Sequence, residues 1–107
     1  MPLRTRVKLP DEIKVGDIIE IKTLVSHVME TGQRRNPDGT PIARNIVNSL
    51  KASFNGEPVF AADLYPGISS NPYLAFHMKV TEPGELEIVW TEDRGPKTVW
   101  RASINPS

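Results

Sequence analysis

The sequence predicts an all-β protein, an immunoglobulin-like antiparallel β-sandwich of about seven strands without a disulfide. Short runs of alternating or β-branched residues recur along the chain, and turn-forming residues separate them. The 10 prolines and 7 glycines fall almost wholly in these breaks, which leaves little room for a long helix. There is no cysteine, so apolar packing must hold the sheets together. We expect one domain over residues 1–107, long enough for a core without cross-links.

The expected strands, in chain order, are residues 3–9, 18–26, 46–54, 59–64, 73–80, 86–91 and 98–104. Between the third and fourth, Asn55-Gly56 predicts a two-residue hairpin, because both central positions of such a turn need a positive φ. Asn36-Pro37-Asp38-Gly39 predicts a type I turn with Gly39 in the left-handed region, which makes residues 31–45 a protruding ribbon. Further turn signals are Pro10-Asp11, Pro66-Gly67, Pro83-Gly84 and Arg94-Gly95-Pro96.

Alternation within the runs also predicts which side chains face the core. The inward set includes Ile46, Leu50, Phe54, Leu74, Phe76, Met78, Val80, Leu86, Ile88 and Trp90. Burial of such a side chain contributes about 1.5–3 kcal/mol. Val47 and Val89 are predicted to point outward, and Trp100 lies in a strand that alternates weakly. These three residues are candidate interface positions, because a lone sandwich would otherwise expose them.

The charge and hydropathy of the chain limit the classes of partner that it can bind. The 13 basic and 13 acidic residues cancel, so no global field favours nucleic acid or an anionic membrane. No apolar run approaches the roughly 20 residues that span a bilayer. The N-terminus lacks the apolar segment of a secretory signal, which by itself indicates the cytoplasm. Locally the charge is uneven: the ribbon tip is basic, whereas a stretch after residue 81 is acidic and reads as a solvated strand face, with Glu82, Glu85, Glu87, Glu92 and Asp93.

The segment of residues 26–32 reads S-H-V-M-E-T-G at the exit of a hydrophobic strand. Nucleophilic catalysis by Ser26 and His27 is disfavoured, because adjacent residues of a strand point to opposite faces. His27 and His77 are the only histidines, and no acidic residue has a ligand-like spacing with both, so no metal site is expected. The acidic stretch matches no calcium-loop pattern.

Two interpretations of this segment stay open. Met29 either plugs the open end of the sandwich or offers a soft, adaptable contact to a partner. The arginines of the ribbon either form an ordinary solvated tip or bind a small anion or a partner carboxylate. We expect recognition, because a polar segment beside a basic loop is better placed for binding than for packing. The predicted partner-binding residues are His27, Met29, Glu30, Thr31, Gly32, Arg34 and Arg35.

The segment resembles S-H-x-M-E-T-G of the SoxZ family, the small subunits of the SoxYZ carrier in bacterial sulfur oxidation. Asn71-Pro72-Tyr73-Leu74-Ala75-Phe76 is similar to the family's N-P-[FY]-L-x-F, and Asn55-Gly56-Glu57-Pro58-Val59 to its N-G-x-x-V hairpin. Residues 89–95 are similar to a family stretch with valine, tryptophan, aspartate and glycine in this order. The resemblance runs from about Val7 to Ile104. Val28 departs from it, because many relatives carry a stiffening proline there.

This resemblance implies a sandwich with no cofactor and no catalytic residue, and therefore no enzyme activity. It implies a heterodimer with SoxY, which carries sulfur intermediates on a cysteine of a mobile arm and presents them transiently to other sulfur-oxidation enzymes. The lack of cysteine agrees with it, because the reactive thiol then belongs to the partner alone. The implied location is the periplasm, reached by export together with SoxY. In isolation the chain is expected to form homodimers or aggregate.

Two other functions remain open from the residues. The chain could be a free-standing module that binds a small anion or a protein ligand, which co-purification with a cysteine-bearing partner would distinguish. It could also be an enzyme that uses His27 and Glu30 as an acid–base pair, which activity of the isolated chain would test.

Overall fold

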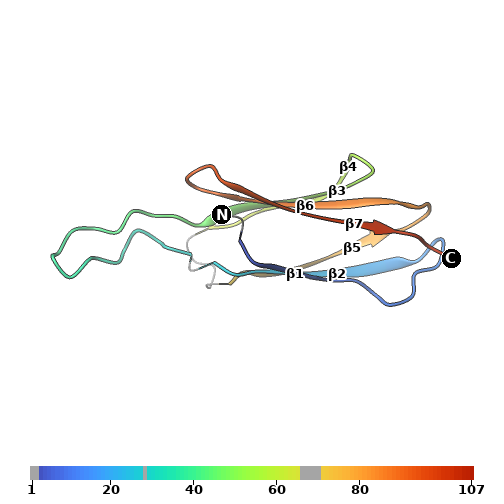
Figure 1. Cartoon of the computed structure of the whole chain (residues 1–107), viewed down its shortest axis with the longest axis horizontal. Coiled ribbons are helices and arrows are strands. Elements are labelled where there is room, and N and C mark those ends of the chain that lie inside the picture. The colour runs from blue at the N-terminus through green and yellow to red at the C-terminus, as the bar shows by residue number, and fades with distance from the viewer. Residues whose placement is uncertain (1–2, 28, 66–70) are drawn as a thin grey trace.

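Seven strands form two antiparallel sheets that face each other in a computed structural model of the chain (Figure 1), which describes residues 3–27, 29–65 and 71–107. The strands are β1 Thr5–Lys8, β2 Ile18–Val25, β3 Val47–Phe54, β4 Glu57–Asp63, β5 Tyr73–Lys79, β6 Gly84–Glu92 and β7 Lys97–Ile104. The predicted all-β sandwich is therefore confirmed. The interpretations of Val28 and of the Pro66-Gly67 turn fall outside the described residues.

The first sheet has the order β1-β2-β5 and the second the order β4-β3-β6-β7. The predicted hairpin joins β3 to β4, with φ angles of 53° at Asn55 and 82° at Gly56, as a tight turn with two left-handed residues requires. Strands β2 and β3 are consecutive but lie in different sheets, so residues 26–46 pass from one layer to the other. Within the described residues, no helix is long and apolar enough to cross a membrane.

The core lies between the sheets and follows the predicted alternation. Leu86, Ile88 and Trp90 of β6 are buried, as are Phe76 and Met78 of β5, whereas Leu74 is half-buried against them. The ring of Phe60 in β4 stacks on that of Phe76 in β5, with centroids 4.7 Å apart, a contact that joins one sheet to the other. These contacts take the place of a disulfide.

Val47 corrects the alternation argument. Strict alternation predicts that it points outward as a candidate interface residue, but it is 0% exposed. The register between β3 and β6 shifts between Val47 and Ser49, the position of a β-bulge, where two residues of one strand oppose one of its neighbour. The extra residue returns Val47 to the core face, beside Ile46, which is buried as well. Val47 is therefore closed to a partner in this fold.

Residues 30–45 form a ribbon that projects from one end of the sandwich and makes the molecule 59 Å long but only 20 Å wide (Figure 1). β-bridges pair Glu30 with Asn45 and Arg35 with Pro41 across the two legs. At the tip the backbone N–H of Gly39 donates to the carbonyl of Asn36 at 2.9 Å, and Gly39 has a φ of 89°. The predicted turn and the protruding ribbon are both confirmed.

Candidate partner-binding site at the root of the ribbon

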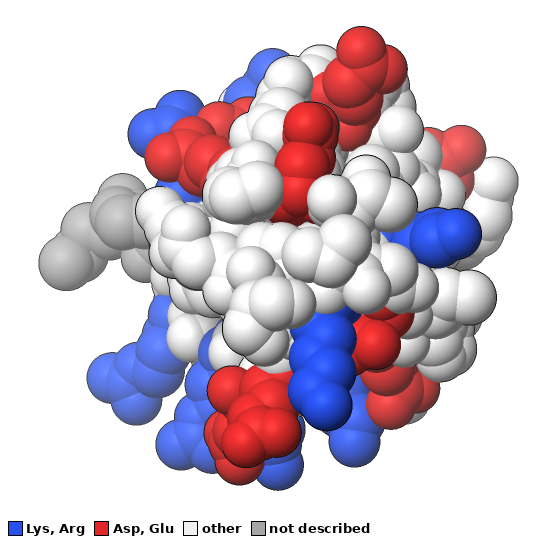
Figure 2. Space-filling model, turned by 90° about the vertical axis from the view of Figure 1, so that its right-hand side faces the viewer, with Lys and Arg blue, Asp and Glu red and all other residues white. Residues whose placement is uncertain are grey.

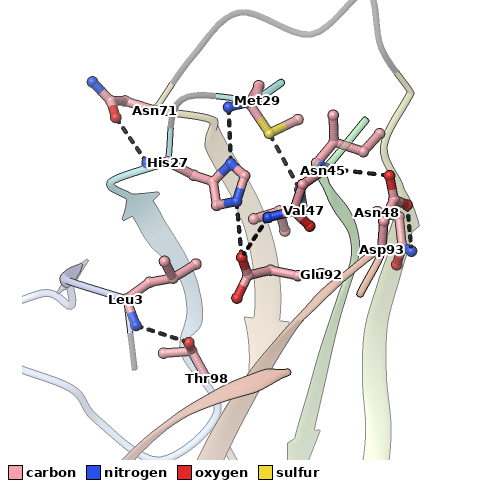
Figure 3. A network of polar contacts seen from close by, with 11 residues as sticks. Leu3, His27, Met29, Asn45, Val47, Asn48, Asn71, Glu92, Asp93 and Thr98 are labelled. Carbon is pink, nitrogen blue, oxygen red and sulfur yellow. Dashed lines mark hydrogen bonds and ion pairs between the residues drawn. The ribbon is translucent and has the colours of Figure 1, made fainter. Parts of the chain in front are cut away.

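His27 lies where the ribbon leaves the sandwich, and both of its ring nitrogens are hydrogen bonded inside the protein (Figure 3). The backbone N–H of Met29 donates to Nδ1 at 2.8 Å, so Nδ1 carries no proton. The proton is then on Nε2, which lies 3.0 Å from Oε1 of Glu92 and donates to it. This network fixes the orientation of the ring, with Nδ1 as acceptor and Nε2 as donor. Ser26, by contrast, is exposed, so the two neighbours lie on opposite sides as predicted.

Asn71 connects the His27 segment to the start of β5. The backbone N–H of His27 donates to the side-chain oxygen of Asn71 at 2.9 Å, and the backbone N–H of Asn71 donates to the carbonyl of His27 at 2.7 Å. Asn71 adopts a φ of 53°, a region that asparagine tolerates better than most residues. The two motifs that the sequence shows separately, at residues 26–32 and 71–76, therefore meet in the fold.

Met29 fills the end of the sandwich. It is buried and packs within the core cluster, and its Sδ accepts from the backbone N–H of Val47 at 3.4 Å. Its φ of 55° is unusual for a residue with a side chain, and it turns the thioether inward. This is the packing alternative of the two that the sequence left open.

Glu92 and Asp93 are site residues that the sequence argument did not find. The prediction of a solvated face is wrong for Glu92, which is buried and accepts from His27 and, at 3.3 Å, from Nδ2 of Asn45. Both act at the junction between β6 and the ribbon. Their position within the family-like stretch, two and three residues after Trp90, is a signal that could have pointed to them.

Asp93 holds the second leg of the ribbon (Figure 3). Its Oδ2 accepts from Nε of Arg44 at 2.7 Å and from the backbone N–H of Ile46 at 3.2 Å. Its Oδ1 accepts from Nδ2 of Asn48 at 3.0 Å. The Arg44 guanidinium lowers the pKa of Asp93, because its hydrogen bond and charge favour the carboxylate, and the Asn48 and Ile46 donors act in the same direction against the effect of burial.

Glu30 and Arg34, four residues apart on the first leg, form an ion pair. Nε of Arg34 donates to both carboxylate oxygens of Glu30, at 2.9 and 3.1 Å, and Nη2 donates to Oε1. The hydrogen bond from Arg34 lowers the pKa of Glu30. Since His27 bonds Glu92 and Glu30 bonds Arg34, the structure does not assemble His27 and Glu30 into an acid–base pair.

The remaining predicted residues line the ribbon itself. Thr31 is half-buried, and Arg35 is exposed and donates from Nη1 to the carbonyl of Gly39 at 3.0 Å. Gly32 has a φ of 86°, and a Cβ there would lie 3.2 Å from Cβ of Arg44. A positive φ and the closeness of Arg44 on the other leg both favour glycine here.

The structure thus divides the predicted binding residues into two groups. His27 and Met29 are buried and shape the root of the ribbon, whereas Arg34 and Arg35 are open to solvent. Binding of a partner by this segment stays a prediction.

Of the candidate interface residues, Val89 is half-buried on the outer face of β6, and Trp100 is half-buried and packs against the core from β7. Within the described residues, no three His, Cys, Asp or Glu side chains are grouped to hold a metal ion.

The sandwich is similar to several solved structures at low sequence identity. The superoxide reductase (neelaredoxin) from Ignicoccus hospitalis is 14% identical, with a TM-score of 0.75 over 98% of this chain and 82% of that chain. The sulfur carrier protein SoxY from Chlorobium limicola f thiosulfatophilum is 14% identical, with a TM-score of 0.66 over 96% of this chain and 78% of that one. At this identity both likenesses show the fold alone.

Sequence comparison is more specific. No curated protein matches the chain, but the family model described as sulphur oxidation protein SoxZ matches residues 7–103, nearly the whole length. The matched region contains all of the motifs at residues 26–32, 55–59, 71–76 and 89–95 as well as the His27–Glu92 pair. The chain therefore belongs to the SoxZ family and is a subunit of the sulfur-oxidation carrier complex.

Proposed function

We propose that this chain is the non-catalytic subunit that binds SoxY and helps to present SoxY's cysteine-bound sulfur intermediates to the sulfur-oxidation enzymes. The match to the SoxZ family over residues 7–103 carries the proposal. The chain contains no cysteine, so the partner has to supply the thiolate that holds the sulfur. In this proposal the complex works in the periplasm, and the chain arrives there by export together with SoxY.

The outer face of the β4-β3-β6-β7 sheet is the surface that we assign to SoxY. Val89 lies directly opposite Val99, which is 46% exposed. Across the sheet Lys51 follows Val89 and Ala61 follows Lys51, and a shallow hollow in the same face is lined by Val89, Ala61 and Pro58 together with polar residues. A partner that covers these apolar side chains removes apolar surface from water, which is the main favourable term in association.

The charges on this face are of both signs. The outward-facing charged residues of the sheet are Lys51, Asp63, Glu85, Glu87, Lys97 and Arg101. Arg101 donates from Nε to Oε2 of Glu87 at 2.7 Å. A face that mixes apolar side chains with charges of both signs has the composition of many protein interfaces.

The ribbon supports a second contact, with the sulfur-bearing arm of SoxY. Sulfur adducts such as a thiosulfonate are anionic, and an arginine can hold such a group by charge-assisted hydrogen bonds. Arg34 already donates to a carboxylate, whereas the one described acceptor of Arg35 is a backbone carbonyl. Arg35 therefore has more donors left for an anion, and we assign it the larger role. His27 and Met29 act indirectly, by anchoring the first leg to β6 and β3.

Affinity for purified SoxY tests the proposal. The chain alone should form homodimers or aggregate and should exchange into a heterodimer at micromolar concentration. Val99→Asp should weaken the affinity at least tenfold, because it places a charge beside Val89 in the proposed interface. Ala75→Asp is the matched control, since Ala75 is exposed on the other sheet.

A monomeric chain that ignores SoxY at this concentration would overturn the proposal. Binding of a small anion or of another protein by such a chain would instead establish a free-standing module.

A further inference from the structure

The outer face of the β1-β2-β5 sheet carries charge of nearly one sign. Its outward positions hold Arg6 and Lys8 on β1, Lys22 on β2 and Lys79 on β5, against Glu20 as the one carboxylate on the three strands. In Figure 2 the lower margin, where Figure 1 places β1 and β2, shows several blue side chains with red ones between them. The net charge of zero for the whole chain therefore conceals a basic sheet face opposite the mixed face assigned to SoxY.

In the part of the chain that the structure describes, two of these charged residues, Arg6 and Lys8, are placed where their charges form no ion pair that would stabilise the fold. Lys8 is the direct cross-strand neighbour of Lys22 in the β1–β2 register, and like charges in opposed positions destabilise a sheet. Nζ of Lys22 lies 3.7 Å from Glu20. Within the described residues, the side chains of Arg6 and Lys8 have no ion pair or hydrogen bond of their own. A partner of opposite charge would relieve the repulsion.

The face also carries the side-chain types that anchor protein interfaces. Arg6, Leu24 and Tyr73 form one continuous row across the three strands. Tyr73 is 58% exposed, and Ile18 at the other end of the face is 71% exposed. Arginine and tyrosine at the centre of a contact contribute most to binding energy, and exposed aliphatic groups beside them favour a protein surface over nucleic acid.

We propose that the outer face of the β1-β2-β5 sheet is a docking surface for an acidic protein surface, separate from the face that binds SoxY. The inference rests on the proposed function, in which a second protein meets the SoxY-bound chain. Its occupant is an enzyme of the sulfur-oxidising system with a carboxylate-rich patch around an apolar centre. The charges accelerate encounter and orient the enzyme, and the Arg6–Leu24–Tyr73 row supplies the contact. The two layers of the sandwich thus serve two partners at once.

The decisive variant is Lys8→Glu, because it should preserve or raise the stability of the chain while it lowers the affinity for the enzyme. A loss of affinity then cannot be caused by loss of the fold. A glutamate opposite Lys22 replaces a repulsion with an attraction, so the melting temperature should stay equal or rise. Affinity of the SoxY-bound chain for at least one purified sulfur-oxidation enzyme should nevertheless fall tenfold or more, with a shallower dependence on salt. Tyr73→Ala should give a comparable loss. Arg94→Glu, the same charge change at an exposed turn outside this face, should leave both quantities unchanged.

Each enzyme is titrated against the wild-type and variant complexes, with a duplex DNA fragment and anionic phospholipid vesicles as further probes. Binding to SoxY is measured first and tests the proposed function. If Lys8→Glu and Tyr73→Ala then bind every enzyme with wild-type affinity, the docking surface is overturned while the proposed function stands. Loss of SoxY binding by Lys8→Glu also overturns it, because the face would then be covered within the carrier. Charge-dependent binding of DNA or vesicles alone would assign the face to a different partner.

Discussion

His27 and Glu92, 65 positions apart, form a hydrogen bond of 3.0 Å between buried side chains. The bond joins the exit of β2 in one sheet to the end of β6 in the other. It also places the imidazole so that Nδ1 accepts from the backbone N–H of Met29. One side chain therefore fixes the direction in which the ribbon leaves the sandwich.

Replacing His27 with alanine should lower the free energy of unfolding by about 1–3 kcal/mol, because it leaves the buried carboxylate of Glu92 and the N–H of Met29 without this partner. Urea denaturation measures the change. His77→Ala is the control, because the His77 side chain is 65% exposed and its removal should matter by less than about 0.5 kcal/mol. Equal stability of the two variants would show that the His27 network contributes nothing to folding.

Asp93 should make stability depend on pH in the acid range. Its folded pKa lies below the ordinary 3.8, chiefly because of the Arg44 guanidinium. A depressed carboxyl pKa contributes stability that is complete above the ordinary value and is lost as the pH falls through the folded value. Asp93→Asn should therefore be less stable at pH 7, by about 0.5–1.5 kcal/mol for each hydrogen bond lost. The wild-type and variant curves should converge as the pH falls below the ordinary value and through the folded one, and parallel curves across the acid range would contradict this role.

Gly32→Ala and Gly39→Ala separate backbone strain from the close approach of the two legs. Both positions have a positive φ, where a Cβ costs about 1–2 kcal/mol. Only at Gly32 would the Cβ also meet Arg44, at 3.2 Å, whereas nothing lies within 4 Å at Gly39. Gly32→Ala should therefore be the more destabilising change and should speed hydrogen exchange at the N–H groups of Glu30 and Asn45. Similar losses for both variants would remove the close approach from the explanation.

The ribbon arginines should affect turnover and not assembly. Replacement of Arg34 and Arg35 with alanine should slow substrate turnover in a system reconstituted with SoxY and the sulfur-oxidation enzymes, with folding and heterodimer formation intact. Arg35→Ala should have the larger effect, because Arg34 is held by Glu30. Added salt should reduce the difference from wild type. Arg94→Ala is the control, and turnover that is unchanged at every ionic strength would return both arginines to an ordinary solvated loop.

Local sequence was sufficient for the strands and their turns. A period of two assigns Leu86, Ile88 and Trp90 to one side of β6 whatever the neighbouring strands are, and they are indeed buried. Asn55-Gly56 specifies its hairpin through the backbone conformations that these two residues tolerate. The family motifs at residues 26–32 and 71–76 were likewise visible in the sequence, as was the lack of any cysteine.

Only the tertiary structure decided what those motifs do. Val47 faces the core because of a register shift between β3 and β6, and the alternation of one strand contains no information about its register with another. His27 meets Glu92, and Lys8 meets Lys22, because separate strands are brought together by packing of the sheets. Short-range patterns determine which face of a strand is apolar, but long-range pairing determines which polar groups become partners, because that choice depends on the free energy of the whole assembled core.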